Sequence, residues 1–196
     1  MKQLAIMKMK SEPLVFVIHK HHATSLHYDF RLEIGGKMPS WAIAKGPSLD
    51  NTVKRLAMPT SDHAMEYRHF EGLIPEGNYG AGPVMIWDEG YYIPEVEISK
   101  GVRELVEDWK MGEQVMKEGM KKGEIKFLLQ GKKMKGSFAL VKTKGWGPKD
   151  SWLMIKHNDE YVVKDYDAKD YDFSAVSKKT IQEIRDSRLG QNDEIS

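Results

Sequence analysis

A strict alternation of polar and apolar residues over Leu26–Ile34 is the feature that most constrains the fold of this chain. In an extended strand, alternate residues point to opposite faces. One face is then apolar and suited to a core: Tyr28, Phe30, Leu32 and Ile34. The other face is polar: His27, Asp29, Arg31 and Glu33. The dipeptide Gly35-Gly36 follows directly and predicts a tight hairpin turn into the next strand.

The rest of the chain is typical of short strands separated by glycine, proline, asparagine and aspartate. Many short, closely spaced strands predict a mainly-β protein with a single compact closed β-barrel. Closure also removes exposed strand edges, which otherwise promote aggregation. We expect strands at Leu14–His19, Leu26–Ile34, Ser40–Lys45, Arg55–Pro59, His69–Ile74, Gly82–Asp88, Tyr91–Ile93, Ile125–Gln130, Ser137–Lys142 and Trp152–His157.

One segment departs from this pattern. Apolar residues from Val102 to Met120 recur at helical spacing, with Ser99 as the candidate cap and Gly123 as the candidate end. We expect this helix to pack on the outside of the barrel, with Trp109 as an ordinary core residue.

A second short helix is expected at Lys179–Ser187, so the barrel carries one or two peripheral helices. The predicted organisation is an N-terminal lead at 1–12, a barrel domain at 13–165 and a C-terminal extension at 166–196. The last residues of that extension, Gly190–Ser196, are expected to be disordered.

Composition narrows the chemistry. The chain has no cysteine, so disulfides and thiolate-bound metals are excluded, and His, Asp and Glu are the strong ligands that remain. No run of about 18 apolar residues predicts a membrane helix, and the N-terminus lacks the apolar core of a signal peptide. A cytoplasmic protein is therefore expected. Abundant Lys and Glu also suggest a heat-adapted source.

The net charge of +1 gives no argument for nucleic-acid binding, but its distribution is uneven. Nine lysines lie between Lys121 and Lys149 against the single acid Glu124. Such a stripe is compatible with a polyanionic partner. An ordinary solvated lysine-rich surface explains it equally well, and both interpretations stay open.

Histidine is scarce, yet four of the seven histidines lie between residues 19 and 27. His21, His27 and Asp29 offer two imidazoles and a carboxylate, which suit Mn²⁺, Fe²⁺ or Zn²⁺. Arg31 on the same strand face suits a phosphate or carboxylate of a substrate. We expect His19 and His22 to point away from His21 and not to be ligands. A solvated polar strand face is the alternative.

A second group of functional residue types lies in Ser61–Gly72. His63 and Tyr67 there fit a general acid or base or a phosphate contact, although such residues are often structural. The glycine-rich stretch Gly72–Gly82 predicts tight turns, which are favoured over an anion-binding loop. Lys45 ends a predicted strand and faces either the site or solvent.

Three functions remain open from these residues. The first is a metal-dependent phosphoesterase that uses His21, His27 and Asp29 with Arg31 on the phosphate. The second is a non-haem iron oxygenase with a triad of His27, Asp29 and His63. The third is a non-catalytic nucleic-acid-binding barrel that uses the lysine stripe. Arg31 beside the candidate ligands favours the first over the third.

The stretch from Phe16 to Glu33 resembles the signature of the 3′-phosphoesterase module of bacterial DNA ligase D. The resemblance extends in register over roughly 13–160. It rests on further motifs at Ser40–Asp50, Lys54–Ala57, Asp62-His63, Phe70–Gly82, Trp87-Asp88 and Trp152–His157.

The resemblance implies a compact β-barrel that heals DNA 3′ ends with a divalent metal, usually Mn²⁺, although Co²⁺ or Zn²⁺ suits the same ligands. It implies removal of a 3′-terminal ribonucleotide by phosphodiesterase action and then of the 3′-phosphate, which leaves a 3′-hydroxyl for repair. The substrates would be 3′ ends of DNA or of RNA–DNA primer-templates. A free-standing monomer is expected, with any ligase or polymerase encoded separately and no membrane association.

The resemblance also implies roles for single residues. The implied metal ligands are His21, His27 and Asp29; the implied phosphate contacts are Arg31, His63, Tyr67, Lys45 and Arg55. Together His21, His27, Asp29, Arg31, His63 and Tyr67 form the expected catalytic set. The sequence departs from the bacterial pattern at His19, where Gln is frequent, and at Ser61, where an acid is frequent. Both departures are expected to alter the surroundings of the metal.

Overall fold

The computed structural model describes residues 13–145 and 147–187. These residues form ten strands, two α-helices and two 3₁₀ helices. The strands are β1 Val15–His22, β2 Leu26–Leu32, β3 Met38–Ile43, β4 Lys54–His63, β5 Gly72–Ile74, β6 Gly82–Ser99, β7 Val102–Leu105, β8 Glu124–Gly131, β9 Lys135–Lys142 and β10 Trp152–Lys156. The helices are α1 Trp109–Lys122, α2 Ile181–Asp186 and the 3₁₀ turns η3 Met65–His69 and η4 Ala168–Tyr171.

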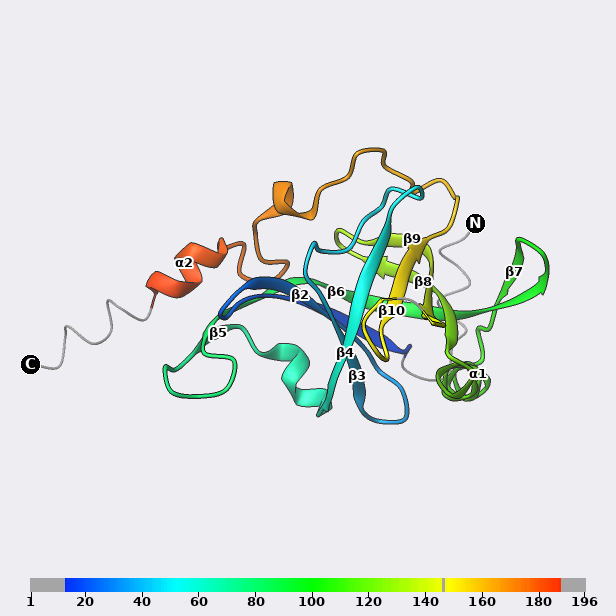
Figure 1. The fold of residues 1–196 in the computed structure, drawn as a ribbon, viewed down its shortest axis with the longest axis horizontal. Helices are drawn as coiled ribbons and strands as arrows, with labels where there is room; N and C mark the ends of the chain where they lie inside the picture. Colours follow the sequence, from blue (N-terminus) through cyan, green and yellow to red (C-terminus); the bar gives the residue numbers. More distant parts are fainter. Residues whose placement is uncertain (1–12, 146, 188–196) are drawn as a thin grey trace, which may run out of the picture.

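Eight strands close into an antiparallel barrel (Figure 1). They follow the order β1-β2-β3-β4-β10-β9-β8-β6, and β6 pairs back onto β1. The short strands β5 and β7 lie outside this ring, and each pairs with a different part of β6. The predicted mainly-β closed barrel with peripheral helices is therefore confirmed.

The barrel interior is filled by apolar side chains. In β2 the predicted alternation holds, because Tyr28, Phe30 and Leu32 are buried in the core cluster. Phe30 packs on the ring of Phe127 from β8, with centroids 5.7 Å apart. The polar face of β2 consequently points to the outside of the barrel.

The hairpin between β2 and β3 forms as predicted. Gly35 and Gly36 have φ values of 66° and 74°. Positive φ at both central residues defines the type I′ turn, whose twist matches that of the paired strands.

Strand β6 replaces two predicted strands. The segments Gly82–Asp88 and Tyr91–Ile93 form one continuous strand, since β1 pairs with it as far as Tyr91 and β8 pairs with it from Gly90 onward. At Gly90 a side chain would collide with the carbonyl oxygen of Gln130, so the glycine permits close backbone packing rather than a turn. Strand β4 similarly continues to His63, beyond its predicted end at Pro59.

The predicted helix over Val102–Met120 is wrong in its first third. Residues 102–105 form β7, which pairs with β6 through a turn at Gly101, where φ is 77°. The helix begins instead after Asp108, whose carboxylate accepts the Met111 amide at 2.8 Å, and it ends at Gly123 as expected. Backbone pairing with β6 outweighs the helical spacing of the apolar residues. That spacing is a local pattern, and it carries no information about a strand that pairs from elsewhere in the chain.

Trp109 is also not a core residue. It is 36% exposed at the first turn of α1, while the helix buries Gly112 and Met116 against the barrel.

The C-terminal segment packs on the barrel. Ala175 donates its amide to the carbonyl of Ile86 at 2.8 Å, at a stretch of β6 between the pairings with β5 and β8. Tyr166, Ala168 and Ile184 join the core cluster. The second predicted helix is confirmed as α2, which starts with a capping box between Thr180 and Glu183. The predicted disorder at Gly190–Ser196 lies outside the described residues. Neither α1 nor α2 is long and apolar enough to cross a membrane.

Candidate metal and phosphate site

The candidate site is built on the outer face of β1 and β2. In their antiparallel register, His21 lies opposite His27 and His19 lies opposite Asp29. Opposite residues share a face, so these side chains gather at one place. The expectation that His19 points away from His21 is wrong, because residues two apart in a strand lie on the same face.

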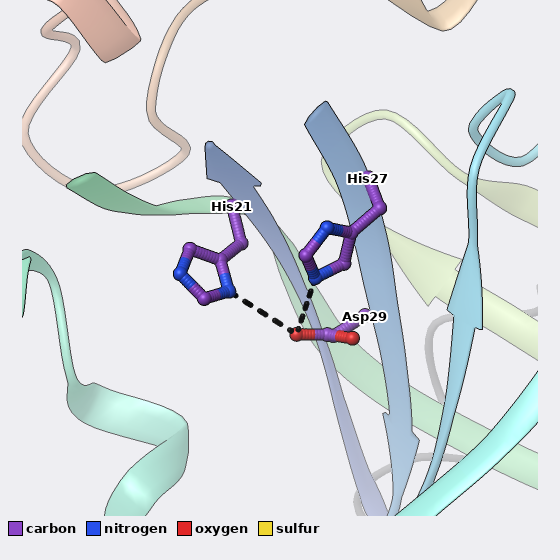
Figure 2. Close-up of side chains that lie close together, drawn as sticks. All are labelled: His21, His27 and Asp29. Atoms are coloured by element: carbon purple, nitrogen blue, oxygen red, sulfur yellow. Dashed lines mark ion pairs between the residues drawn. The ribbon is translucent and has the colours of Figure 1, made fainter. Parts of the chain in front are cut away.

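His21, His27 and Asp29 form a compact group of ligand types (Figure 2). Their candidate ligand atoms all lie within 4.8 Å of one another. Oδ2 of Asp29 is 3.9 Å from Nδ1 of His21 and 3.6 Å from Nε2 of His27. Figure 2 shows both rings directed toward this carboxylate oxygen.

Backbone carbonyls hold the far nitrogen of each imidazole. Nε2 of His21 donates to the carbonyl of Gly80 at 2.7 Å, and Nδ1 of His27 donates to the carbonyl of Ser25 at 3.0 Å. The proton of each neutral ring is thereby placed on the outer nitrogen, and the lone pair faces Asp29. Metal-bound histidines are oriented in this way, so the donor set fits a divalent cation.

Charge within the group follows from burial and contacts. The interaction with Asp29 raises the pKa of His27, whereas burial lowers the pKa of His21. Burial alone would raise the pKa of Asp29, but His27 and Arg31 outweigh it, and the pKa lies below its usual value. The group therefore combines an ionised carboxylate with two imidazoles.

Arg31 lies beside this group and is almost fully buried. Its Nη2 donates to Oδ2 of Asp29 at 2.9 Å, and its Nε donates to Nδ1 of His19 at 3.2 Å. Its Nη1 is 3.0 Å from Nδ1 of His63. A guanidinium has five N–H groups, so these three contacts leave one on each terminal nitrogen. Two such N–H groups can bind a phosphate with two hydrogen bonds, so this pair is a candidate phosphate fork.

The structure brings His63 and Tyr67 to the same place from two elements. His63 ends β4, and Tyr67 lies on η3. The Tyr67 ring lies 4.8 Å from His63, 5.4 Å from His19 and 5.3 Å from the Arg31 guanidinium. Phe70, to which the sequence interpretation gave no role, also stacks on Tyr67, with ring centroids 5.3 Å apart.

His63 has two competing contacts at one nitrogen. Its Nδ1 is near both Nη1 of Arg31 and the carbonyl of Ser61, which is 2.9 Å away. One nitrogen cannot accept from the first and donate to the second, so the contacts belong to different protonation forms. Burial and then the charge of Arg31 lower the pKa of His63, which favours the neutral ring.

Lys45 and Arg55 lie farther along the sheet. The pairing of β2 with β3 and of β3 with β4 puts both at the end of the sheet where β2 begins. Lys45 is exposed in the turn after β3. Arg55 alternates with Leu56 and shares the core-facing side of β4 with Ala57, not the side of Asp29.

The members of the lysine stripe are distributed over the end of α1, β8, the β8–β9 turn, β9 and the loop after β9. Several of them pair with acids: Lys126 with Glu97, Lys132 with Glu89 and Lys142 with Asp150. The solvated interpretation fits these contacts.

Two supporting groups had no separate signal in the sequence. The carbonyls of Ser25 and Gly80 are main-chain atoms, which any residue type supplies. The turns expected in Gly72–Gly82 form at residues 75–81, between β5 and β6, and Gly80 within them also orients His21. The role of His19 as an acceptor for Arg31 could have been predicted, because His19 and His21 are two residues apart and therefore share a strand face.

Fold and site together define a β-barrel protein with a candidate metal and phosphate centre on its outer face. The DNA Ligase D 3′-phosphoesterase domain family matches residues 19–142, and the chain belongs to this family.

Relatives in three bacteria have similar sequences. The multifunctional non-homologous end joining protein LigD of Pseudomonas aeruginosa is 41% identical over 146 residues, which is 74% of this chain and 15% of the relative. The LigD protein of Mycobacterium tuberculosis H37Rv is 38% identical over 154 residues, 78% of this chain and 17% of the relative. That of Mycolicibacterium smegmatis is 39% identical over 145 residues, again 74% and 17%. The chain thus spans about a sixth of the length of these relatives.

Proposed function

We propose that this protein is a metal-dependent phosphoesterase that heals DNA 3′ ends. It removes 3′-terminal ribonucleotides as a phosphodiesterase and 3′-phosphates as a phosphomonoesterase, and leaves 3′-hydroxyls for end joining. Membership of the 3′-phosphoesterase domain family supports the reaction class. The observation that carries the proposal is the fixed Arg31 fork directly beside the His21, His27 and Asp29 group.

His21, His27 and Asp29 would hold the metal, for which we propose Mn²⁺; Co²⁺ and Zn²⁺ suit the same donors. When bound, the ion supplies positive charge that polarises the phosphate and favours attack on phosphorus. Asp29 has a second task, because its Oδ2 also accepts from Arg31 at 2.9 Å. The ligand set and the phosphate contact are therefore fixed in one register.

Arg31 orients the phosphate through its two remaining N–H groups and neutralises charge that develops as the P–O bond breaks. Its rigidity comes from Asp29, His19 and the Tyr67 ring. A donor held in place before reaction costs no reorganisation during it.

His63 supplies the second phosphate contact. When its Nδ1 accepts from Arg31, the proton of the neutral ring lies on Nε2 and is available to a phosphate oxygen or to the leaving oxygen. Tyr67 positions this imidazole and the guanidinium through its ring. We retain exposed Lys45 as a contact of the DNA backbone. Arg55 lies on the other face of β4 and is not part of the proposed site.

The triad that the iron-oxygenase alternative used does not form, because His63 contacts Arg31 and the ligand group in the described residues takes His21 instead. Two histidines and a carboxylate also suit Fe²⁺, so the choice of phosphoester chemistry rests on family membership and on Arg31 beside Asp29. A binding barrel without catalysis would need no fixed arginine beside a ligand set.

A primer–template with a 3′-terminal ribonucleotide, labelled next to that end, tests the proposal with and without Mn²⁺. We expect metal-dependent loss of the nucleoside and then of the phosphate, both absent in Asp29→Asn. Loss of phosphate alone would restrict the enzyme to a 3′-phosphatase. Metal-independent binding without processing would contradict the proposal, and oxygen uptake with Fe²⁺ would favour the oxygenase.

A further inference from the structure

Tyr79 is the most exposed large apolar side chain in residues 13–145 and 147–187. Its relative exposure is 104%, whereas the next such side chain, Met111, reaches 61%. Aromatic rings usually bury 150–250 Å² each when they pack, so this ring forgoes a large contact area. A fully exposed ring with no packing role is a candidate for contact with a ligand.

The backbone under Tyr79 is held in a defined turn. The amide of Ala81 donates to the carbonyl of Asn78 at 3.1 Å, so residues 78–81 form a β-turn with Tyr79 at its first corner. Gly80 follows with φ of 73°, which is the value that a type II turn requires at the next position. The turn thus presents the ring outward.

The same turn belongs to the candidate metal site. The carbonyl of Gly80, the residue after Tyr79, accepts from Nε2 of His21 at 2.7 Å. Tyr79 therefore directly precedes the residue whose carbonyl orients a candidate metal ligand. In Figure 1 the loop between β5 and β6 extends from the end of the sheet where β2 begins.

A cation lies at the same strand end. Nη2 of Arg185, on α2, is 3.1 Å from Nδ1 of His22, the neighbour of His21. Helix α2 packs against β5 and β6, the strands that the Tyr79 loop joins. Proteins that bind single-stranded nucleic acids combine exposed aromatic rings, on which bases stack, with cations that contact the backbone. Tyr79 supplies the ring at this strand end and Arg31 supplies the cation at the candidate site, whereas Arg185 contacts His22, which alternates with His21 along β1 and lies on the other face.

We infer that Tyr79 stacks on the nucleobase at the 3′ end of the substrate and makes the site selective for nucleotide ends over simple phosphate esters. This inference rests on the proposed function. Because every base has a π face, the contact tolerates all four bases. Tyr79 is thus a specificity-determining residue that binds the substrate beside the reacting phosphate.

The first test compares two 3′-phosphorylated strands that differ only in the last residue, which carries a base in one and is abasic in the other. Tyr79→Ala should raise KM for the base-bearing strand by roughly 5- to 150-fold, as expected for the loss of one stacked base, with kcat little changed. KM for the abasic strand should stay the same. Tyr79→Trp should restore wild-type KM, and Tyr161→Ala, which removes another exposed tyrosine, should change neither strand.

A second measurement needs no turnover. A strand that ends in 2-aminopurine should lose fluorescence when it binds the wild-type protein without metal, and Tyr79→Ala should abolish this quenching. Unchanged quenching, or equal KM effects on both strands, would overturn the inference while the proposed function stands. Quenching by Tyr79 without any processing would support stacking and contradict the proposed function. No binding of 3′ ends would overturn both.

Discussion

Nη2 of Arg31 and Oδ2 of Asp29 are 2.9 Å apart, and both side chains are buried. The oxygen that accepts from the arginine is the same one that faces His21 and His27. One carboxylate oxygen therefore links the candidate ligand set to the candidate phosphate fork, and changes at either residue are expected to affect both.

Removal of the Arg31 side chain should lower the free energy of unfolding more for the metal-free protein than for the metal-bound protein. Arg31→Ala leaves the buried Asp29 carboxylate unpaired, which typically costs about 3–5 kcal/mol. Saturating Mn²⁺ would pair that charge again, so the loss in the free energy of unfolding should be smaller when metal is bound. Urea unfolding with and without Mn²⁺ measures this difference. Equal losses would show that Asp29 does not bind the metal.

Gly80→Ala should weaken metal binding through the orientation of His21. A Cβ at this position would lie 3.3 Å from Cε1 of His21, and φ is 73°, so the carbonyl is expected to shift. Loss of such an orienting partner typically reduces metal affinity 10- to 100-fold. Isothermal titration with Mn²⁺ measures it.

Gly77→Ala is the matched control for this change. It introduces similar strain at a φ of 85° but meets no atom within 4 Å. It should therefore lower stability by about 1–2 kcal/mol and leave metal affinity unchanged. A comparable loss of affinity in both variants would mean that loop strain, not the His21 contact, is responsible.

His19→Gln should retain activity, whereas His19→Leu should not. Nδ1 of His19 accepts from Nε of Arg31 at 3.2 Å, and the carbonyl oxygen of a glutamine side chain can accept the same bond. Leucine leaves a buried donor without a partner, which costs about 1–3 kcal/mol and releases the guanidinium. We expect kcat within a few-fold of wild type for Gln and a loss of at least tenfold for Leu. Similar kcat in both would remove His19 from the support of Arg31.

Stability should fall in mild acid partly because of His157, which lies far from the candidate site. Burial, with the charge of Arg103, lowers the pKa of His157 to about 4. Between pH 6.5 and 4 the His157 imidazole is protonated in the unfolded chain but stays neutral in the folded chain. The contribution of His157 to the free energy of unfolding is therefore present above pH 6.5 and is lost as the pH falls toward 4.

The expected slope is below about 1.4 kcal/mol per pH unit, since partial exposure reduces it. His157→Gln should flatten the dependence of the free energy of unfolding on pH between 6.5 and 4. An unchanged slope would assign the acid sensitivity to other groups.

Local patterns predicted the parts of this fold that depend on local physics. The alternation over Leu26–Ile34 and the Gly35-Gly36 turn specify a strand face and a hairpin within a few residues, and both form. The helix prediction was wrong for Val102–Leu105 because the spacing of their apolar residues also fits a helix. Their pairing with β6 is a tertiary interaction that a local pattern does not specify. The ligand types in the candidate site were visible along one strand. The carbonyls that orient these ligands could not be predicted, because every residue type has the same backbone carbonyl.

The packed interior of the barrel has a consequence for how the proposed enzyme would distinguish a 3′ end from an unbroken strand. Phe30, Trp41 and Phe127 fill the space that a tunnel would need, so nucleic acid has no blind channel into which only a terminus could be threaded. A continuous strand can lie across the outer face as readily as a broken one. Discrimination must then come from what a terminus exposes, such as the extra charge of a monoester or a base free to leave its neighbours.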